Sequence, residues 1–164
     1  MDYIYSVSKI EFGTPTGAAT LPGALAQLPD TVKGSITIEE SEGATVKHFV
    51  DQKKEPIKVV KTEEGEMLIT CQFNDFDAVQ FAAFKGGTAV TGASASFTPS
   101  TGYTNVEKAI KITFDSAHTL EIYNANCQAR LTGGGGRDKM LAWELKIIPQ
   151  LTANGLGSYK LGKV

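Results

Sequence analysis

The sequence predicts a mainly β protein in which two antiparallel sheets form a sandwich or barrel, with one short flanking α-helix at about residues 75–85. Segments of alternating apolar and polar residues recur along most of the chain, and turn residues separate them at short intervals. Only one segment has good helical spacing. The 164 residues suffice for one domain with a sizeable core, so we expect a single domain over residues 1–164.

Charge and composition narrow the classes of partner. The chain has 16 Lys and Arg against 18 Asp and Glu, a net charge of −2, which gives no electrostatic reason for tight binding to nucleic acid or to an anionic membrane. No apolar run approaches the roughly 18 residues of a membrane span. The first residues include an acid and alternate, so we expect no signal peptide. Cys71 and Cys127 form no CxxC pair, and two buried thiols are favoured over a disulfide because nothing else indicates secretion.

The segment Met67–Thr88 organises the chain. Residues 66–73 alternate as a half-buried strand, with Met67, Ile69, Cys71 and Phe73 on one face. Asn74 or Asp75 is expected to cap the following helix, with Asp77 in its first turn. An apolar stripe is then expected against a sheet, and Gly86 is expected to end the helix. The predicted stripe consists of Phe76, Val79, Ala83 and Phe84.

The N-terminal half is predicted to contain two strands and two long excursions. Residues 3–12 form a first strand, and residues 13–31 form a long loop with one or two helical turns between Pro22 and Pro29. Residues 32–40 form a second strand with Ile36 and Ile38 on the core face.

Residues 44–63 are strongly charged and are predicted to project as a hairpin, with two arms joined around Asp51–Pro56. Turns are expected before it at Glu42–Gly43 and after it at Glu64–Gly65. A segment this charged cannot bury enough apolar surface to offset the cost of ordering it, yet it is more apolar than a plain linker requires, so the hairpin is a candidate for partner contact.

The C-terminal half is predicted to be antiparallel β. Residues 88–105 hold one edge strand that ends at Pro99. A hairpin turns at Asp115–His118, a short strand covers Cys127–Leu131, and Gly133–Gly136 form a hairpin tip. Residues 141–147 form the clearest strand, and the tail at residues 150–164 is expected to be open and polar.

Signals for catalysis are weak. His48 and His118 fall in different β segments, and with two unclustered cysteines they do not form a zinc site. Asn74, Asp75 and Asp77 resemble the start of a calcium loop, but the glycine and distal glutamate of that loop are missing. The glycines at 133–136 lack phosphate-loop spacing. We therefore expect no enzyme activity and no cofactor.

The order of features resembles the major tail tube proteins of long-tailed bacteriophages. The resemblance lies in an acid, short helix and Gly-Gly phrase at Asp75–Gly87, a proline-ended strand at Ala93–Ser100, a hairpin at Lys108–Ala125 and a closing strand at Met140–Pro149. It implies a two-sheet sandwich whose copies form stacked hexameric rings around a lumen that passes DNA without binding it specifically. It also implies other tail proteins as partners, a place in the virion tail, and the host cytoplasm during assembly. Secretion-system tubes share this fold.

The resemblance also suggests two sets of functional residues and no catalytic ones. The projecting hairpin is expected to contact the next ring through Lys47, Asp51, Lys53, Lys54 and Glu55. The polar faces of strands 32–40 and 66–73 are expected to line the lumen through Ser35, Thr37, Glu39, Thr70 and Gln72.

Two other classes of function are compatible with a β-sandwich. One is an extracellular carbohydrate-binding or adhesion module, although the five tyrosines are too scattered to form one aromatic surface. The other is a small β-barrel enzyme or ligand carrier, which the lack of converging polar residues disfavours. If the purified protein forms rings or tubes, the tail tube hypothesis is favoured over both of these alternatives.

Overall fold

The computed structural model describes residues 3–134 and 141–163, and it confirms a mainly β protein with antiparallel sheets and one helix in that part of the chain. The sheets are arranged like a sandwich and do not close into a barrel. The elements are β1 Val7–Gly13, β2 Ala26–Gln27, β3 Thr37–Glu40, β4 Thr45–His48, β5 Lys58–Lys61, β6 Met67–Phe73, α1 Ala78–Lys85, β7 Gly87–Val90, β8 Ser96–Pro99, β9 Val106–Phe114, β10 His118–Gly133, β11 Leu141–Pro149 and β12 Tyr159–Lys163.

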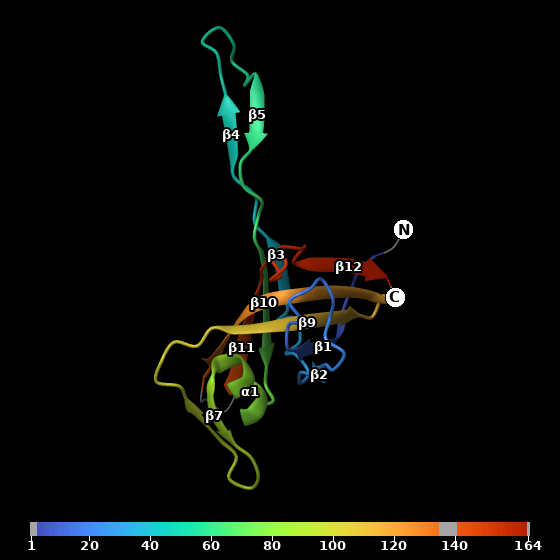
Figure 1. The fold of residues 1–164 in the computed structure, drawn as a ribbon, viewed down its shortest axis with the longest axis vertical. Helices are drawn as coiled ribbons and strands as arrows, with labels where there is room; N and C mark the ends of the chain where they lie inside the picture. The colour runs from blue at the N-terminus through green and yellow to red at the C-terminus, as the bar shows by residue number, and fades with distance from the viewer. Residues whose placement is uncertain (1–2, 135–140, 164) are drawn as a thin grey trace.

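The central strand is β10. The strand order is β2-β1-β9-β10-β11-β6-β3, and β12 also pairs with β10. One edge of β10 pairs with β9, while the other edge pairs first with β12 and then with β11. The β9 pairing shifts register between Ile122 and Ala125, so the sheet bends where β10 passes from one half to the other. Figure 1 shows β9, β10 and β12 running across the direction of β3.

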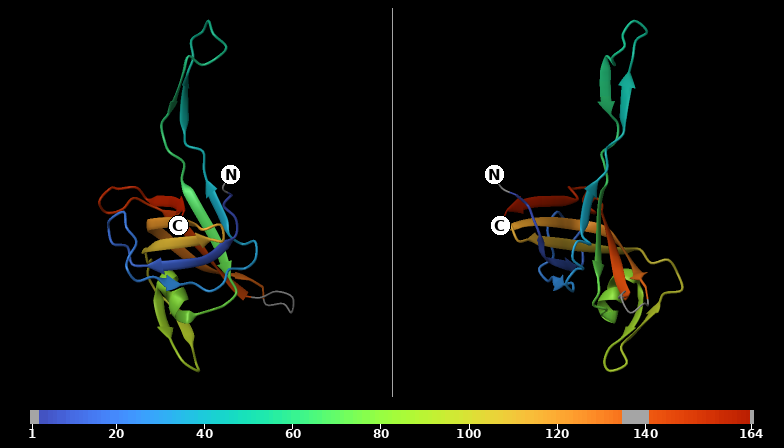
Figure 2. Two further views of the ribbon diagram at one scale, coloured as in Figure 1. Left: turned by 90° about the vertical axis from the view of Figure 1, so that its right-hand side faces the viewer. Right: turned by 180° about the vertical axis from the view of Figure 1, so that it is seen from behind.

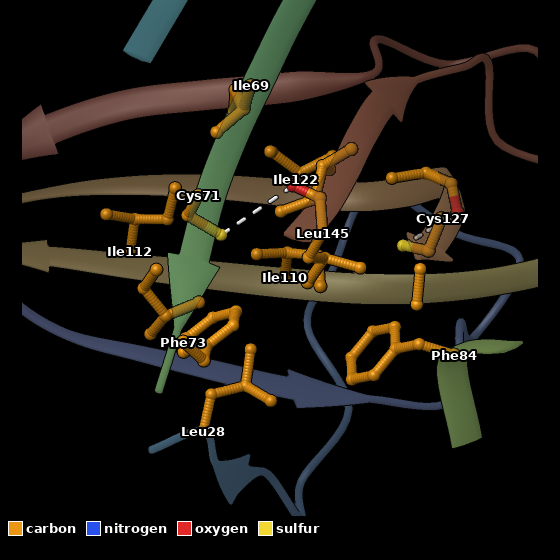
Figure 3. Packing of buried hydrophobic residues seen from close by; sticks show 14 of the residues in the cluster. Leu28, Ile69, Cys71, Phe73, Phe84, Ile110, Ile112, Ile122, Cys127 and Leu145 are labelled. Carbon is orange, nitrogen blue, oxygen red and sulfur yellow. Dashed lines mark hydrogen bonds between the residues drawn. The ribbon is translucent and has the colours of Figure 1, made fainter. Parts of the chain in front are cut away.

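The core lies between the two halves of this bent sheet. Figure 3 shows β6 crossing over the strands that carry Ile110 and Ile122, with Ile69, Cys71 and Phe73 among the core side chains. These three β6 residues are fully buried, which confirms the alternation predicted for residues 66–73. Phe73 stacks on Trp143 of β11 with ring centroids 4.4 Å apart, and this contact ties the two neighbouring strands together on the core side.

The helix begins later than the sequence indicated. Asp77 is the N-cap, and its Oδ1 accepts hydrogen bonds from the N–H groups of Val79 (2.8 Å) and Gln80 (3.2 Å). The predicted caps, Asn74 and Asp75, lie in the link before it, where the Asp75 carbonyl accepts a hydrogen bond from Trp143 Nε1. Gly86 ends the helix with a positive φ of 75°, as expected.

The later start rotates the buried face of the helix. Phe81 and Phe84 are fully buried, whereas Phe76 and Val79 of the predicted stripe are 46% and 48% exposed. The rings of Phe81 and Trp143 make an edge contact at 5.6 Å, and Phe81 makes another with Phe97 of β8 at 4.8 Å. These contacts set the orientation of the helix. They join residues from different segments, so no pattern within one segment could predict them.

Several edge elements also differ from expectation. The loop at residues 13–31 contains no helical turn; β2 instead pairs with β1, and Leu28 is buried beside it. The expected lone edge strand near residue 97 is β8 of a separate hairpin with β7. The short strand predicted at Cys127–Leu131 is the end of the continuous β10, and the tail contributes β12. Half of the predicted glycine tip, residues 135–136, lies outside the described residues.

Replacing Phe84 with alanine should test the helix placement. Phe84 packs on Phe12 with centroids 4.8 Å apart, so Phe84→Ala should lower the free energy of unfolding by about 3–5 kcal/mol in a denaturant titration. Phe76→Ala is the matched control, because its ring is half exposed, and it should cost markedly less. Equal effects of the two substitutions would show that the helix face is assigned wrongly.

Candidate functional site

The most prominent surface feature is a long hairpin, residues 41–66, which we call the arm. It projects from the body between β3 and β6 and carries β4 and β5 (Figures 1 and 2). Within the described chain β4 and β5 pair only with each other, so this part of the arm is a two-stranded ribbon. The projecting hairpin predicted at residues 44–63 is therefore present, and the chain on either side of it leads into β3 and β6 of the body sheet.

The arm continues the β3–β6 ladder with one shift in register. Glu40 lies opposite Met67, and Thr45 lies opposite Lys61. The advance from Glu40 to Thr45 is five positions, whereas the advance from Lys61 to Met67 is six, so the register shifts by one residue. The turns predicted at Glu42–Gly43 and Glu64–Gly65 are wrong. Both glycines lie in two antiparallel segments, residues 41–44 and 62–66, which join the β4–β5 ribbon to the body and which we call the neck. Each glycine was interpreted as a turn signal, but its role here is to let the two backbones of the neck approach each other closely.

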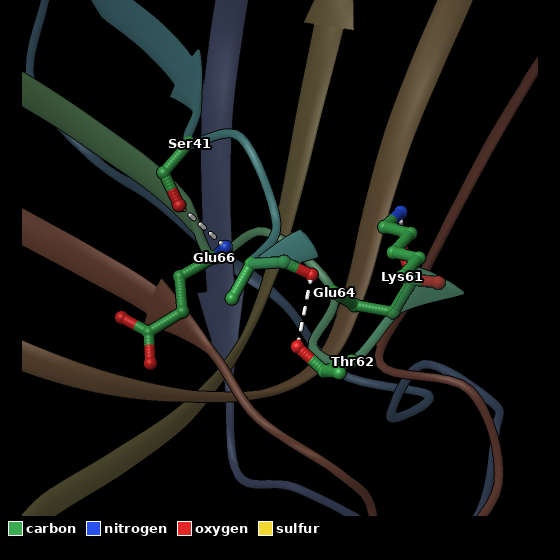
Figure 4. Close-up of polar contacts among 6 residues, drawn as sticks. Ser41, Lys61, Thr62, Glu64 and Glu66 are labelled. Carbon is green, nitrogen blue, oxygen red and sulfur yellow. Dashed lines mark hydrogen bonds and ion pairs between the residues drawn. The ribbon is translucent and has the colours of Figure 1, made fainter. Parts of the chain in front are cut away.

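Close contacts hold the neck together (Figure 4). The N–H of Ser41 donates to the Glu66 carbonyl at 2.9 Å, and the Glu66 N–H donates to Ser41 Oγ at 2.9 Å. The N–H and hydroxyl of Thr62 both donate to the Ala44 carbonyl, at 2.8 and 3.1 Å. Lys61 forms an ion pair with Glu64. The arm is thus joined to the body by a hydrogen-bonded neck.

The two neck glycines are required by the space between the chains. A Cβ at Gly43 would lie 2.0 Å from the Glu63 carbonyl oxygen, and a Cβ at Gly65 would lie 1.6 Å from the Ser41 carbonyl oxygen. Real Cβ atoms do not approach backbone this closely, so any other residue would force the two chains of the neck apart.

The distal arm is both basic and apolar. Residues 45–61 hold five lysines against Asp51 and Glu55, a net charge of +3. The five predicted contact residues, Lys47, Asp51, Lys53, Lys54 and Glu55, are all exposed there, and none forms an ion pair with another described residue. Four large apolar side chains of the same segment are about half exposed: Val46, Phe49, Ile57 and Val59.

The predicted lumen residues gather on a second surface, the outer face of β3 and β6. Thr37 lies opposite Thr70, and Gln72 lies opposite Glu144, so their side chains share one side of the sheet with Glu39. Ser35 lies at the edge of this face, where its Oγ accepts a hydrogen bond from the Gln72 N–H at 3.1 Å. The structure thus brings all five predicted residues together.

The polar face extends further than the sequence analysis predicted. It continues across β11 and β10 through Lys146, which lies opposite Thr70, and through Gln128 and Arg130. Part of this face borders an open hollow of about 630 Å³. The alternation of Glu144 and Lys146 with buried Trp143, Leu145 and Ile147 was the available signal, since it places these charges opposite the core.

One ion pair lies on the polar face. Arg130 Nε and Nη2 both donate to Glu144 Oε1 at 2.7 Å, and Gln72 Nε2 donates to Glu144 Oε2 at 3.4 Å. The hydrogen bond from Arg130 lowers the pKa of Glu144 below its usual value, so this carboxylate stays ionised. Arg130 and Glu144 therefore offset each other's charge on this face.

Other chemically reactive groups in the described residues do not converge. His118 Nδ1 lies 2.9 Å from the Ser116 carbonyl oxygen in a turn, and His48 lies on the arm. No group of three or more His, Cys, Asp or Glu side chains there could hold a metal ion. The described part of the chain also contains no helix long and apolar enough to cross a membrane.

Replacing Gly65 should distort the neck. Gly65→Ala should lower the melting temperature and increase amide exchange in the neck, because the new Cβ would collide with backbone rather than with a flexible side chain. Gly102→Ala is the matched control, since a Cβ there meets nothing within 4 Å. Unchanged exchange at Ser41 and Glu66 in the Gly65 variant would contradict the close approach.

The two thiols should be unreactive in the folded protein. Cys71 and Cys127 are free and buried, and burial raises the pKa of each to about 12 from a usual value near 9. A thiol reagent at pH 8 should therefore titrate neither thiol until the protein unfolds. Stability should fall as pH rises from about 9 to 12, because only the unfolded chain then loses these protons. Rapid labelling of the native protein would contradict this burial.

Comparisons with known proteins do not assign this chain to a family. No protein-family model matches it, and no curated protein matches it. Its function must therefore be inferred from its sequence resemblance and from the surfaces described above.

Proposed function

We propose that this protein is the structural subunit of a phage tail tube, which self-assembles into stacked hexameric rings whose lumen conducts DNA. The arm is the observation that carries this proposal. A two-stranded ribbon is marginally stable by itself in water, and this one exposes four large apolar side chains. Contact with a neighbouring subunit would cover that surface, and the resemblance to tail tube proteins supports another copy of this chain as that neighbour.

The polar face supports the second part of the proposal, a lumen. A channel through which DNA slides must not hold phosphates, because lysine and arginine contacts to phosphate are the main source of nonspecific affinity. On this face Arg130 is held by Glu144, and Glu39 offsets Lys146 in net charge. A face that combines this ion pair with small polar side chains such as Thr37 and Thr70 meets that requirement.

The proposal implies a virion location and needs no cofactor. The protein would assemble in the host cytoplasm and remain in the virion tail, with other tail proteins at the ends of the tube. A secretion-system tube has the same architecture, and its lumen would meet a different cargo. An adhesion module remains the alternative if the protein proves to be a strict monomer.

Electron microscopy of the purified protein at rising concentration tests the proposal. The full chain should form rings or tubes, and a variant in which a short Gly-Ser link replaces residues 45–61 should fold but fail to assemble. Raising the salt concentration should also weaken assembly, because the exposed lysines of the arm are screened. A monomer at all concentrations, or tubes formed equally well without the arm, would refute the proposal.

A further inference from the structure

A second exposed apolar surface lies at the end of the body opposite the arm. It is a hollow of about 370 Å³ where the start of α1 meets the β7–β8 hairpin. Figure 1 shows the arm at the top of the long axis and α1 with β7 at the bottom, so one molecule cannot fold its own arm into this hollow.

The hollow has apolar walls and an acidic rim. Phe76, Val79 and Val90 line it, and each is about half exposed to water. Asp75 and Asp77 also line it, whereas no Lys or Arg does. Asp77 uses one carboxylate oxygen as the helix cap, but the Asp75 carboxylate has no partner among the described residues, so its charge is free to meet a cation.

The distal arm has the complementary surface. Val59 lies opposite Lys47 on one side of the ribbon, and the strand alternation places Phe49 and Ile57, one residue beyond the strands, on that same side. This side therefore combines three half-exposed apolar side chains with lysines, on a segment of net charge +3. Apolar contact in the centre with opposite charges at the rim is the usual anatomy of a protein interface.

We propose that the hollow between α1 and the β7–β8 hairpin receives the distal arm of a second copy of this chain. This inference rests on the proposed function, because it requires that copies associate. The contact joins two different surfaces at opposite ends of the molecule, so it is heterologous, and each copy that has received an arm still offers its own. Repetition of the contact therefore extends the assembly along the long axis rather than closing a dimer.

Disulfide trapping between two single-cysteine variants tests this contact. Phe49→Cys and Val79→Cys proteins are mixed and oxidised under assembly conditions, and a dimer joining the two variants should form. The native thiols will not interfere, because Cys71 and Cys127 are buried. The matched control is Phe49→Cys mixed with Thr37→Cys, which places the second thiol on the exposed polar face, away from the hollow.

A charge reversal gives an independent readout. Asp75→Lys should weaken assembly because it places a cation against the basic arm. It should leave the melting temperature of the monomer unchanged, because the Asp75 carboxylate has no partner among the described residues and only the backbone carbonyl of Asp75 accepts the hydrogen bond from Trp143. If the mixed Phe49→Cys and Val79→Cys proteins form tubes but oxidation gives no disulfide between them, this inference alone is overturned. A disulfide yield no greater than that of the Thr37 control would also overturn it, whereas the absence of any assembly would overturn the proposed function as well.

Discussion

Backbone pairing along β10 is the constraint on which the rest of the fold depends. This 16-residue strand pairs on one edge with β9 and on the other with β12 and β11, so its polar backbone groups are satisfied only if both halves of the protein form around it. The register shift near Ile122 turns the second half of the sheet across the first. The isoleucines of β9 and the β6 residues then face a common core, which α1 covers with Phe81 and Phe84.

The arm inherits its position from this core. Its second chain continues into β6, where Ile69, Cys71 and Phe73 are fully buried and cannot shift register without exposing them. The neck adds the glycine contacts at Ser41 and Glu63, which leave no room for a side chain between the chains. A ribbon that would be poorly determined by itself is thereby held at a fixed point of the body.

Elements with a strong local pattern could be predicted from the sequence, and elements defined by a distant partner could not. The alternation of β6 is complete within seven residues, so its buried face was predicted correctly. The strands β2 and β12 exist because β1 and β10 offer free edges, which no local pattern records. The helix cap was predicted at Asn74 or Asp75 but lies at Asp77, and the hydrogen bond from Trp143 to the Asp75 carbonyl keeps Asp75 outside the helix.

The same distinction applies to the candidate site. Thr37, Thr70 and Gln72 could be grouped because each follows the alternation of its own strand. Arg130 and Glu144 were missed because their pairing depends on β10 and β11 lying side by side. Gly43 and Gly65 were seen but misread, since glycine marks both turns and close approaches, and only the opposing chain distinguishes the two.

One continuous chain from Lys58 to Phe73 links the arm to the polar face. Its distal part forms the β5 edge of the arm, its middle forms the neck, and β6 presents core residues on one side and Thr70 and Gln72 on the other. A neighbour that holds the arm therefore acts directly on the strand that carries the polar face. Since the neck glycines admit no bulkier residue and β6 is locked in the core, contact at the arm fixes the orientation of that face as well. In a repeating assembly, the same element would set both the spacing of subunits and the direction in which their polar faces point.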